Sequence, residues 1–319
     1  MKKFLATAVL GGVLALGLGG AAKAEFPEKN VRIIVPFSPG GAVDFTSRLI
    51  AEVGSDYLGG QKIIVENMPG GGAVVGQSYV SRAKPDGYTV LAYTSSVINN
   101  PIVKKTPYTY KSFQTLAMYC LDPEVVIAPS NSAFANVADL VKASKSGAVS
   151  IATPGHSTSH HIAALVLAKE AGAQFNYIHN ESAAMQFQQV MGGHVDAAFV
   201  SMGEALSNAK DGRIKILGVM SEERVPAMLD VPTLAEVGLP ALDHMATFRG
   251  LAVPAETPRE VVDKLAAALE KVVADPRFVE GMNKGGYPIA YRGPDAFSTY
   301  VDKVAVVMEE ILPTLKKPE

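Results

Sequence analysis

Short runs of β-branched and aliphatic residues alternate with helical patterns along most of this 319-residue chain. The first run covers residues 31–35 and is stopped by Pro36. Apolar side chains then recur every four residues, as on one face of a helix: Phe45, Leu49, Val53 and Tyr57. Strands that alternate with helices are typical of parallel α/β architecture, because parallel strands need a crossover between them. The sequence therefore predicts an α/β protein.

The alternation divides into two units. We expect strands at 31–35, 62–66 and 89–93 with a helix at 73–83, then, from Val125 on, strands at 149–152, 174–178, 195–200 and 214–219. Helices are expected at 136–145, 158–171, 183–191, 202–210, 258–273 and 294–311. Two strand stretches, 119–128 and 247–254, are the expected crossings between lobes. This predicts lobe 1 from residues 25–122 plus 250–319, and lobe 2 from 123–249.

Residues 1–24 have the pattern of an export signal. Lys2 and Lys3 precede an apolar stretch, and Ala22-Lys23-Ala24 has the small-x-small form of a cleavage site. An uncleaved anchor is the alternative, because the stretch is long enough to span a bilayer. We predict cleavage before Glu25 and a soluble mature protein in the periplasm.

The composition excludes several function classes. The 29 basic residues include three signal lysines, so the mature chain has 26 basic and 31 acidic residues, a net charge of −5. Nucleic-acid binding needs a concentrated basic surface and is not expected. The only cysteine, Cys120, cannot form an intramolecular disulfide. We expect no cofactor, since neither a dinucleotide fingerprint nor a P-loop spacing is present. We also expect a monomer.

Three glycine-bearing loops follow predicted strands, at residues 36–44, 69–72 and 153–160. A loop of this kind before a helix N-terminus offers unpaired N–H groups to a carboxylate or phosphate. Asp44 is interpreted as the N-cap of the helix that follows the first loop. Tight structural turns and ordinary Ser/Thr helix caps remain the alternatives for these loops.

Seven segments in a fixed order resemble the substrate-binding proteins of tripartite tricarboxylate transporters, the Bug family. They are VRIIVPFSPGGAVDFTSRLIAE, KIIVENMPGGGAVVG, AKPDGYTVL, TPGHSTSHHIAALVLAKEAG, MGGHVDAAFV, DVPTLAEVGLP and LAVPAETP. The resemblance covers essentially the whole mature chain. It implies a type II periplasmic binding fold, with two lobes joined by two crossing strands, that closes around a small organic carboxylate. It also implies membrane permease subunits as partners and no enzymatic activity.

The resemblance further implies a set of ligand-binding residues. In lobe 1 these are Phe37, Ser38, Gly40, Gly41, Asp44, Thr94 and Ser95, and in lobe 2 they are Gly155, Ser157, His160 and Asp196. A cap or turn role is the alternative for Asp196. The chain departs from many relatives at 178–183 and at 248–250, and both places face the cleft in the implied fold. The identity of the ligand is therefore open.

Arg249 stands in an apolar stretch expected to line the cleft. A buried arginine needs a partner, and its planar fork suits a second carboxylate. That reading adds Arg249 to the ligand-binding residues and favours a di- or tricarboxylate. An internal ion pair with Asp243 or another acid is the alternative.

Two other functions were considered. His156, His160 and His161 lie at spacings that could share a metal ion, although the pattern is not HExxH and further ligands would be needed. His161 was expected to cover the surface. A hydrolase is disfavoured because Ser157 and His160 cap a helix start better than they form a triad, and no GxSxG motif is present.

Overall fold

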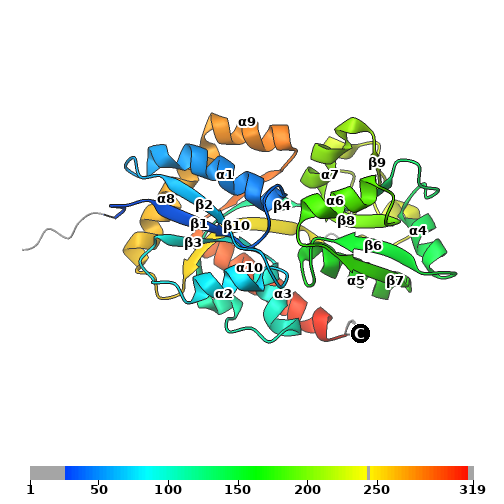
Figure 1. Ribbon diagram of the computed structural model, residues 1–319, viewed down its shortest axis with the longest axis horizontal. Coiled ribbons are helices and arrows are strands. Elements are labelled where there is room, and N and C mark those ends of the chain that lie inside the picture. Colours follow the sequence, from blue (N-terminus) through cyan, green and yellow to red (C-terminus); the bar gives the residue numbers. More distant parts are fainter. Residues whose placement is uncertain (1–25, 243–244, 315–319) are drawn as a thin grey trace, which may run out of the picture.

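The computed structural model describes residues 26–242 and 245–314. Within these residues the strands form one sheet of six strands and one of five. Figure 1 shows the two sheets side by side, each accompanied by helices. The α/β class and the two-lobed arrangement expected from the sequence are therefore confirmed.

The first sheet combines strands from both ends of the chain, in the order β11-β4-β10-β3-β1-β2. Its strands are β1 (Val31–Val35), β2 (Ile63–Asn67), β3 (Thr89–Thr94), β4 (Phe113–Asp122), β10 (Thr247–Pro254) and β11 (Ile289–Arg292). β1 is parallel to β2 and β3, whereas β10 is antiparallel to β3 and β4. One face is covered by α1 (Ala42–Gly54), α8 (Arg259–Ala274) and α9 (Pro276–Gly285). The other is covered by α2 (Val74–Ser81), α3 (Ser96–Val103) and α10 (Pro294–Ile311).

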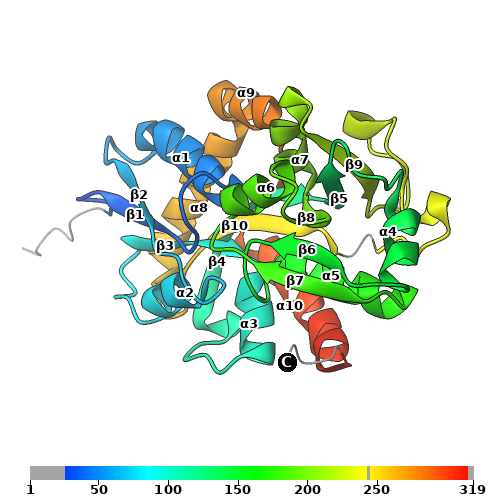
Figure 2. The same cartoon turned by 45° about the vertical axis from the view of Figure 1, so that its right-hand side comes forward.

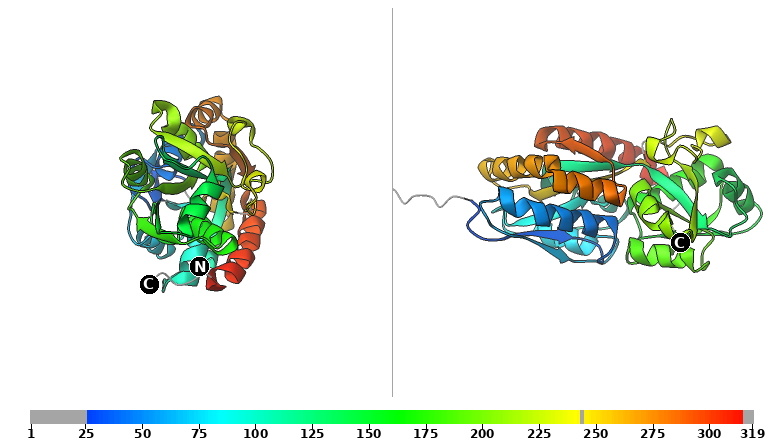
Figure 3. Two further views of the ribbon diagram at one scale, coloured as in Figure 1. Left: turned by 90° about the vertical axis from the view of Figure 1, so that its right-hand side faces the viewer. Right: turned by 90° about the horizontal axis from the view of Figure 1, so that it is seen from above.

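The second sheet is built from the middle of the chain, in the order β7-β6-β8-β5-β9. Its strands are β5 (Glu124–Pro129), β6 (Val149–Thr153), β7 (Phe175–His179), β8 (Ala197–Ser201) and β9 (Ile214–Val219). The helices α4 (Val137–Ser144) and α5 (Ser159–Ala171) pack on one face. The helices α6 (Ala183–Met191) and α7 (Met202–Asn208) pack on the other. Figure 3 shows how these layers lie beside those of the first sheet.

The chain passes between the sheets at two places, as Figure 2 makes visible around β4, β5 and β10. The predicted single strand 119–128 is in fact β4 and β5, separated by Pro123. Proline has no backbone N–H to donate, so it interrupts a ladder. All of β10 pairs with β4 in the first sheet, from Thr247 to Pro254. The predicted lobe boundary between 249 and 250 therefore falls inside a strand.

The buried face of α1 differs from the one predicted. Thr46, Ile50 and Val53 are buried, whereas Phe45 is 42% exposed. Phe45 instead contacts the ring of Tyr287, with ring centroids 5.7 Å apart. The residues of the period-four pattern lie on two different surfaces of α1. The helix α9, which was not predicted from the sequence, covers the side of α1 that carries Phe45. The helix α3 and the strand β11 were likewise not predicted from the sequence.

Candidate functional site

A narrow pocket of about 50 Å³ lies between the two lobes. It is bordered by the loops after β1, β3, β6, β7 and β8. Ligands of α/β proteins bind preferentially beyond the carboxyl ends of strands, where neighbouring loops diverge. Its lining residues are Phe37, Ser38, Gly41, Ala42, Val43, Asp44, Thr94, Ser96, Pro154, Thr158, Ser159, His160, Ala183, Glu204, Thr247 and Arg249. Seven of the predicted site residues are among them.

Four helix N-termini reach this pocket. Ala42 begins α1, Ser96 begins α3, Ser159 begins α5 and Ala183 begins α6, and all four residues line the pocket. The first N–H groups of a helix have no partner within the helix, and the helix dipole is positive at that end. Each terminus therefore favours an anion, and together they favour one placed between the lobes.

The loop after β1 is held by Asp44. The N-cap of α1 is Gly41, not Asp44 as predicted, because the helix begins at Ala42. Asp44 lies in the first turn, where its carboxylate accepts the Gly40 N–H at 3.0 Å and pairs with Arg48 at 2.9 Å. Burial would raise the pKa of Asp44, but Arg48 and the Gly40 N–H hold it below its ordinary value. Asp44 therefore fixes the shape of the loop that approaches the pocket.

The loops of the two lobes already touch. A Cβ at Gly41 would lie 3.4 Å from the Cβ of Ala183, and one at Gly40 would lie 3.7 Å from that of Ala184. In a neighbouring hollow between the lobes, Lys104 donates to the carbonyl oxygens of Gly71, at 2.8 Å, and His156, at 2.9 Å. One of these carbonyls belongs to each lobe. The structure is thus a closed arrangement of the lobes.

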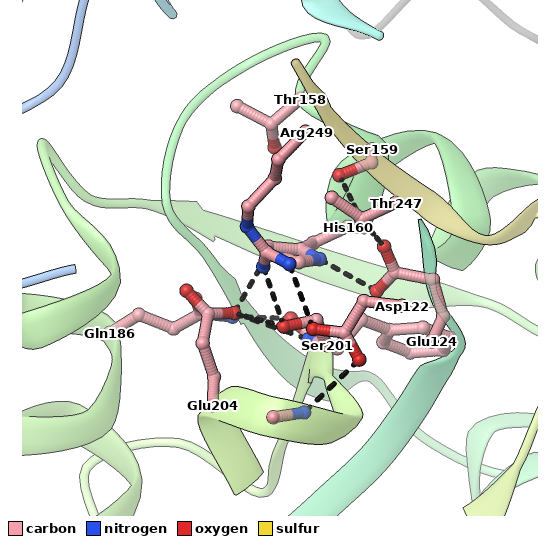
Figure 4. A network of polar contacts seen from close by, with 12 residues as sticks. Asp122, Glu124, Thr158, Ser159, His160, Gln186, Ser201, Glu204, Thr247 and Arg249 are labelled. Atoms are coloured by element: carbon pink, nitrogen blue, oxygen red, sulfur yellow. Dashed lines mark hydrogen bonds and ion pairs between the residues drawn. The ribbon is translucent and has the colours of Figure 1, made fainter. Parts of the chain in front are cut away.

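His160 lies at the base of the pocket between two carboxylates. Its Nδ1 is 2.6 Å from Glu124 Oε2, and its Nε2 is 3.1 Å from Glu204 Oε2 (Figure 4). Burial opposes a charge on the ring, but Glu124 and Glu204 raise the pKa of His160 to about 10. Burial likewise opposes ionisation of Glu204, but His160 holds the pKa of Glu204 at about 2. His160 is therefore an imidazolium at neutral pH.

Arg249 completes the same network from β10. It is 1% exposed, and its Nη1 is 2.8 Å from Asp122 Oδ2 (Figure 4). Nη2 donates to Ser201 Oγ at 2.8 Å. Of the two predicted readings, the internal ion pair is the one observed, and its partner is Asp122. Asp243 lies outside the described residues. Arg249 still lines the pocket, although its charge is already paired.

The remaining predicted residues lie around the pocket or away from it. Thr94 lines it and is hydrogen-bonded to Ser96 at 2.8 Å, and Ser95 is buried beside it. Ser157, with φ at +65°, bonds through Oγ to the His156 ring rather than lining the pocket. Gly155 borders a neighbouring hollow between the lobes, of about 480 Å³.

Asp196 lies at the amino ends of its neighbouring strands and not beside the pocket. It precedes β8 and accepts hydrogen bonds from the backbone N–H and the hydroxyl of Ser150, at 2.8 and 2.6 Å. Ser150 is near the start of β6, so Asp196 joins the amino ends of two strands whose carboxyl ends face the pocket. The turn role considered for Asp196 is the one that its contacts fit.

The histidines do not gather as a metal site would require. His160 points to Glu124 and Glu204, whereas His156, His161 and His179 form a separate cluster with ring centroids 4.6 to 5.4 Å apart. His161 is fully buried and does not cover the surface as expected. Burial lowers the pKa of His156 to about 4 and that of His161 to about 2. Across the described residues, no three or more His, Cys, Asp or Glu side chains are arranged to hold a metal ion.

A larger open hollow, of about 700 Å³, lies at the amino end of β1 and is bordered by Lys29, Arg32 and Arg82. It is far from the helix N-termini that converge between the lobes. We assign the candidate site to the narrower pocket because the polar groups able to fix a ligand face it.

Sequence reasoning missed the acids of the site. Asp122, Glu124 and Glu204 lie outside the glycine-bearing loops and carry no local motif. A weak signal was available, because Glu124 and Asp122 flank Pro123 inside an otherwise apolar crossing stretch. A charged residue in such a stretch predicts a buried partner.

These features define a two-lobed periplasmic solute-binding protein, and the comparisons with known proteins agree. BugD, a periplasmic binding protein, aligns with a TM-score of 0.83 and 29% identity, covering 90% of this chain and 98% of BugD. MatC of Rhodopseudomonas palustris aligns with a TM-score of 0.84 at 24% identity, covering 90% of this chain and all of MatC. The family model for the tripartite tricarboxylate transporter family receptor, TctC, matches residues 46–305. This chain belongs to that receptor family.

A curated relative supports the same assignment. A UPF0065 protein from the tcbD-tcbE intergenic region of Pseudomonas sp. strain P51 is 32% identical over 278 residues, 86% of this chain and 82% of the relative. Proteins of this receptor family are periplasmic solute-binding receptors and not enzymes. Within the described part of the chain, no helix combines the length and apolarity needed to cross a bilayer.

Proposed function

We propose that this protein captures a small organic carboxylate between its lobes and delivers it to the membrane subunits of a tripartite tricarboxylate transporter. The observation that carries this proposal is the convergence of the N-termini of α1, α5 and α6 on one pocket. Both cationic side chains that line the pocket, His160 and Arg249, are already paired with acids. The carboxylate is therefore held by neutral donors, through charge-assisted hydrogen bonds.

Closure of the lobes is the second element of the proposal. A pocket of about 50 Å³ has room for only a few water molecules, since a cavity needs about 10–15 Å³ of such space for each. The lobes must part to admit a ligand, and the ligand stabilises the closed arrangement through its stronger contacts there. We propose that the chain passes from one lobe to the other at Pro123 and at the segment before Thr247. With this boundary, all of β10 belongs to the lobe of the first sheet.

Two structural neighbours carry a carboxylate in their own structures. MatC was solved with bound malate, and Rpa4515 of R. palustris with adipate. Both are less than 25% identical to this chain, so they bear on its fold rather than on its ligand. The preference for a di- or tricarboxylate that we drew from Arg249 loses its basis, because that side chain is paired with Asp122.

Export belongs to the same proposal. We propose that residues 1–24, which lie outside the described residues, are removed and that the mature monomer acts in the periplasm. Mass analysis of the exported protein should give Glu25 as its first residue. A protein that retains residues 1–24 and sediments with membranes would show an uncleaved anchor instead.

The decisive test places a charge among the helix N-termini. Ala183→Asp puts a carboxylate at the start of α6, whereas Ala183→Asn has almost the same shape and no charge. We expect Ala183→Asp to bind carboxylates at least about tenfold more weakly than Ala183→Asn, because like charges repel strongly in a site shielded from water. Met185→Asp is the matched control, because it lies in the same helical turn but its side chain is exposed.

Calorimetry and thermal shift with a panel of carboxylates provide the readout. A ligand that binds only the folded protein adds about 2.7 kcal/mol of stability at one hundred times its Kd. Mass spectrometry of ligand released from natively purified protein identifies the compound. Equal carboxylate affinities in Ala183→Asp and Ala183→Asn would place the carboxylate site elsewhere.

A further inference from the structure

The network at the base of the pocket carries more acids than bases. Asp122, Glu124 and Glu204 provide three carboxyl groups, and His160 and Arg249 provide two cations; all five side chains are buried. With every group ionised, the network has a net charge of −1. The network therefore gains from additional positive charge.

Two atoms of this network are unused. Glu204 Oε2 accepts from His160 Nε2, Ser201 N and Ser201 Oγ, at 3.1 to 3.2 Å. Glu204 Oε1 accepts no hydrogen bond from the described residues. The Nε of Arg249 is buried and has no partner among the described residues. Both side chains line the pocket, but the Nε of Arg249 is itself fully buried, so Glu204 Oε1 is the unused atom that a ligand can reach.

A ligand donor that reaches the free oxygen of a carboxylate gains a charge-assisted hydrogen bond. Glu204 Oε1 calls for an N–H or O–H donor. A second carboxylate on the ligand has no proton to donate, and it would be buried against a network that already has a surplus acid. An ammonium group supplies both the donor and the missing positive charge. A hydroxyl supplies the donor without the charge.

From these contacts we propose that the ligand is a monocarboxylate that also bears a hydrogen-bond donor, an amino acid or a hydroxy acid, with the donor directed at Glu204 Oε1. The carboxylate sits at the helix N-termini, so the inference rests on the proposed function. Glu204 is then a specificity-determining residue, which selects the second group of the ligand rather than its carboxylate.

The test uses a ligand series in which only the end group changes. At each of three chain lengths, the amino, hydroxy and carboxy forms are compared: glycine, glycolate and malonate; 3-aminopropanoate, 3-hydroxypropanoate and succinate; 4-aminobutanoate, 4-hydroxybutanoate and glutarate. At the best-fitting length, we expect the amino or hydroxy acid to bind about tenfold or more tightly than the dicarboxylate, measured by calorimetry on the whole mature protein.

Two variants locate the effect. Glu204→Gln keeps an acceptor oxygen but removes the charge, so it should weaken the amino acid more than the hydroxy acid. Glu236→Gln is the matched control, since that carboxylate pairs with Arg224 on the exposed surface of the same lobe. The wild-type series decides the question even if Glu204→Gln fails to fold.

The outcomes separate the inference from the proposed function. If a dicarboxylate binds most tightly at every length, the inference is wrong while carboxylate capture stands. If the hydroxy acid binds more tightly than the amino acid, and Glu204→Gln weakens the binding of both equally, the donor on the ligand is a hydroxyl. If no member of the series binds, both the inference and the proposed function fail for small carboxylates.

Discussion

Replacement of His160 by Gln tests the buried network most directly. The substitution removes the imidazolium that stands between Glu124 and Glu204 and leaves two buried carboxylates without their shared partner. Breaking a buried pair by removing one member costs about 3–5 kcal/mol. At about 2–4 °C per kcal/mol for a domain of 150–250 residues, a loss of at least roughly 6 °C in melting temperature follows.

The pH dependence of stability gives an independent value for the contribution of His160 to the free energy of unfolding. Folding raises the pKa of His160 from its ordinary 6.5 to about 10, so the folded state holds this proton more tightly than the unfolded state. The stabilisation is complete below pH 6.5 and is lost as the pH rises toward 10. At 1.36 kcal/mol per pH unit, this interval sets an upper bound of about 5 kcal/mol, in agreement with the cost of breaking the pair.

The assay is denaturant unfolding of wild type and His160→Gln at several pH values between 6 and 10. Differences in midpoint at constant slope give differences in stability. The difference in unfolding free energy between wild type and His160→Gln should be largest near pH 6. It should shrink by roughly 3 kcal/mol or more toward pH 10. His194→Gln, at an exposed position, is the control and should parallel wild type. A gap that stays constant across this range would refute a charged His160.

Three further predictions concern the contacts between and within the lobes. Gly72→Ala should weaken ligand binding, because a Cβ there would lie 2.2 Å from a carbonyl oxygen of the other lobe. The control Gly59→Ala has nearly the same φ but open space around it, so it should cost only about 1 kcal/mol of stability. Equal ligand affinities of Gly72→Ala and Gly59→Ala would argue against this contact in the bound state. Lys104→Met should lower ligand affinity about five- to thirtyfold by removing two hydrogen bonds that bridge the lobes. Calorimetry compares its ligand affinity with that of Lys105→Met, a control at an exposed position. Comparable binding by the two variants would exclude a bridging role for Lys104. Arg249→Lys should destabilise the protein by about 2–4 kcal/mol in denaturant unfolding, because an ammonium cannot reproduce the two-sided fork; unchanged stability would mean that the pairing with Asp122 contributes little.

Local sequence was sufficient for the parts of the site that local rules govern. The glycine-bearing loops, the strands before them and the helices after them follow from turn chemistry and periodicity, and the structure places strands at 31–35 and 214–219 as predicted. Where two surfaces share one helix, periodicity failed. The face of α1 was misassigned because Phe45 contacts Tyr287, which is more than two hundred residues away in sequence.

The sequence by itself determined the α/β class, the order of most of the elements and the loops that present helix N-termini to an anion. Only the tertiary structure decided which charges meet. Arg249 pairs with Asp122 from 127 residues away, and His160 with Glu124 from 36. A buried charge requires a partner, but the requirement does not name it, because any acid brought near by the fold would serve. The pairing depends on strand register and on how the lobes join, and these are properties of the assembled fold rather than of any segment of the chain.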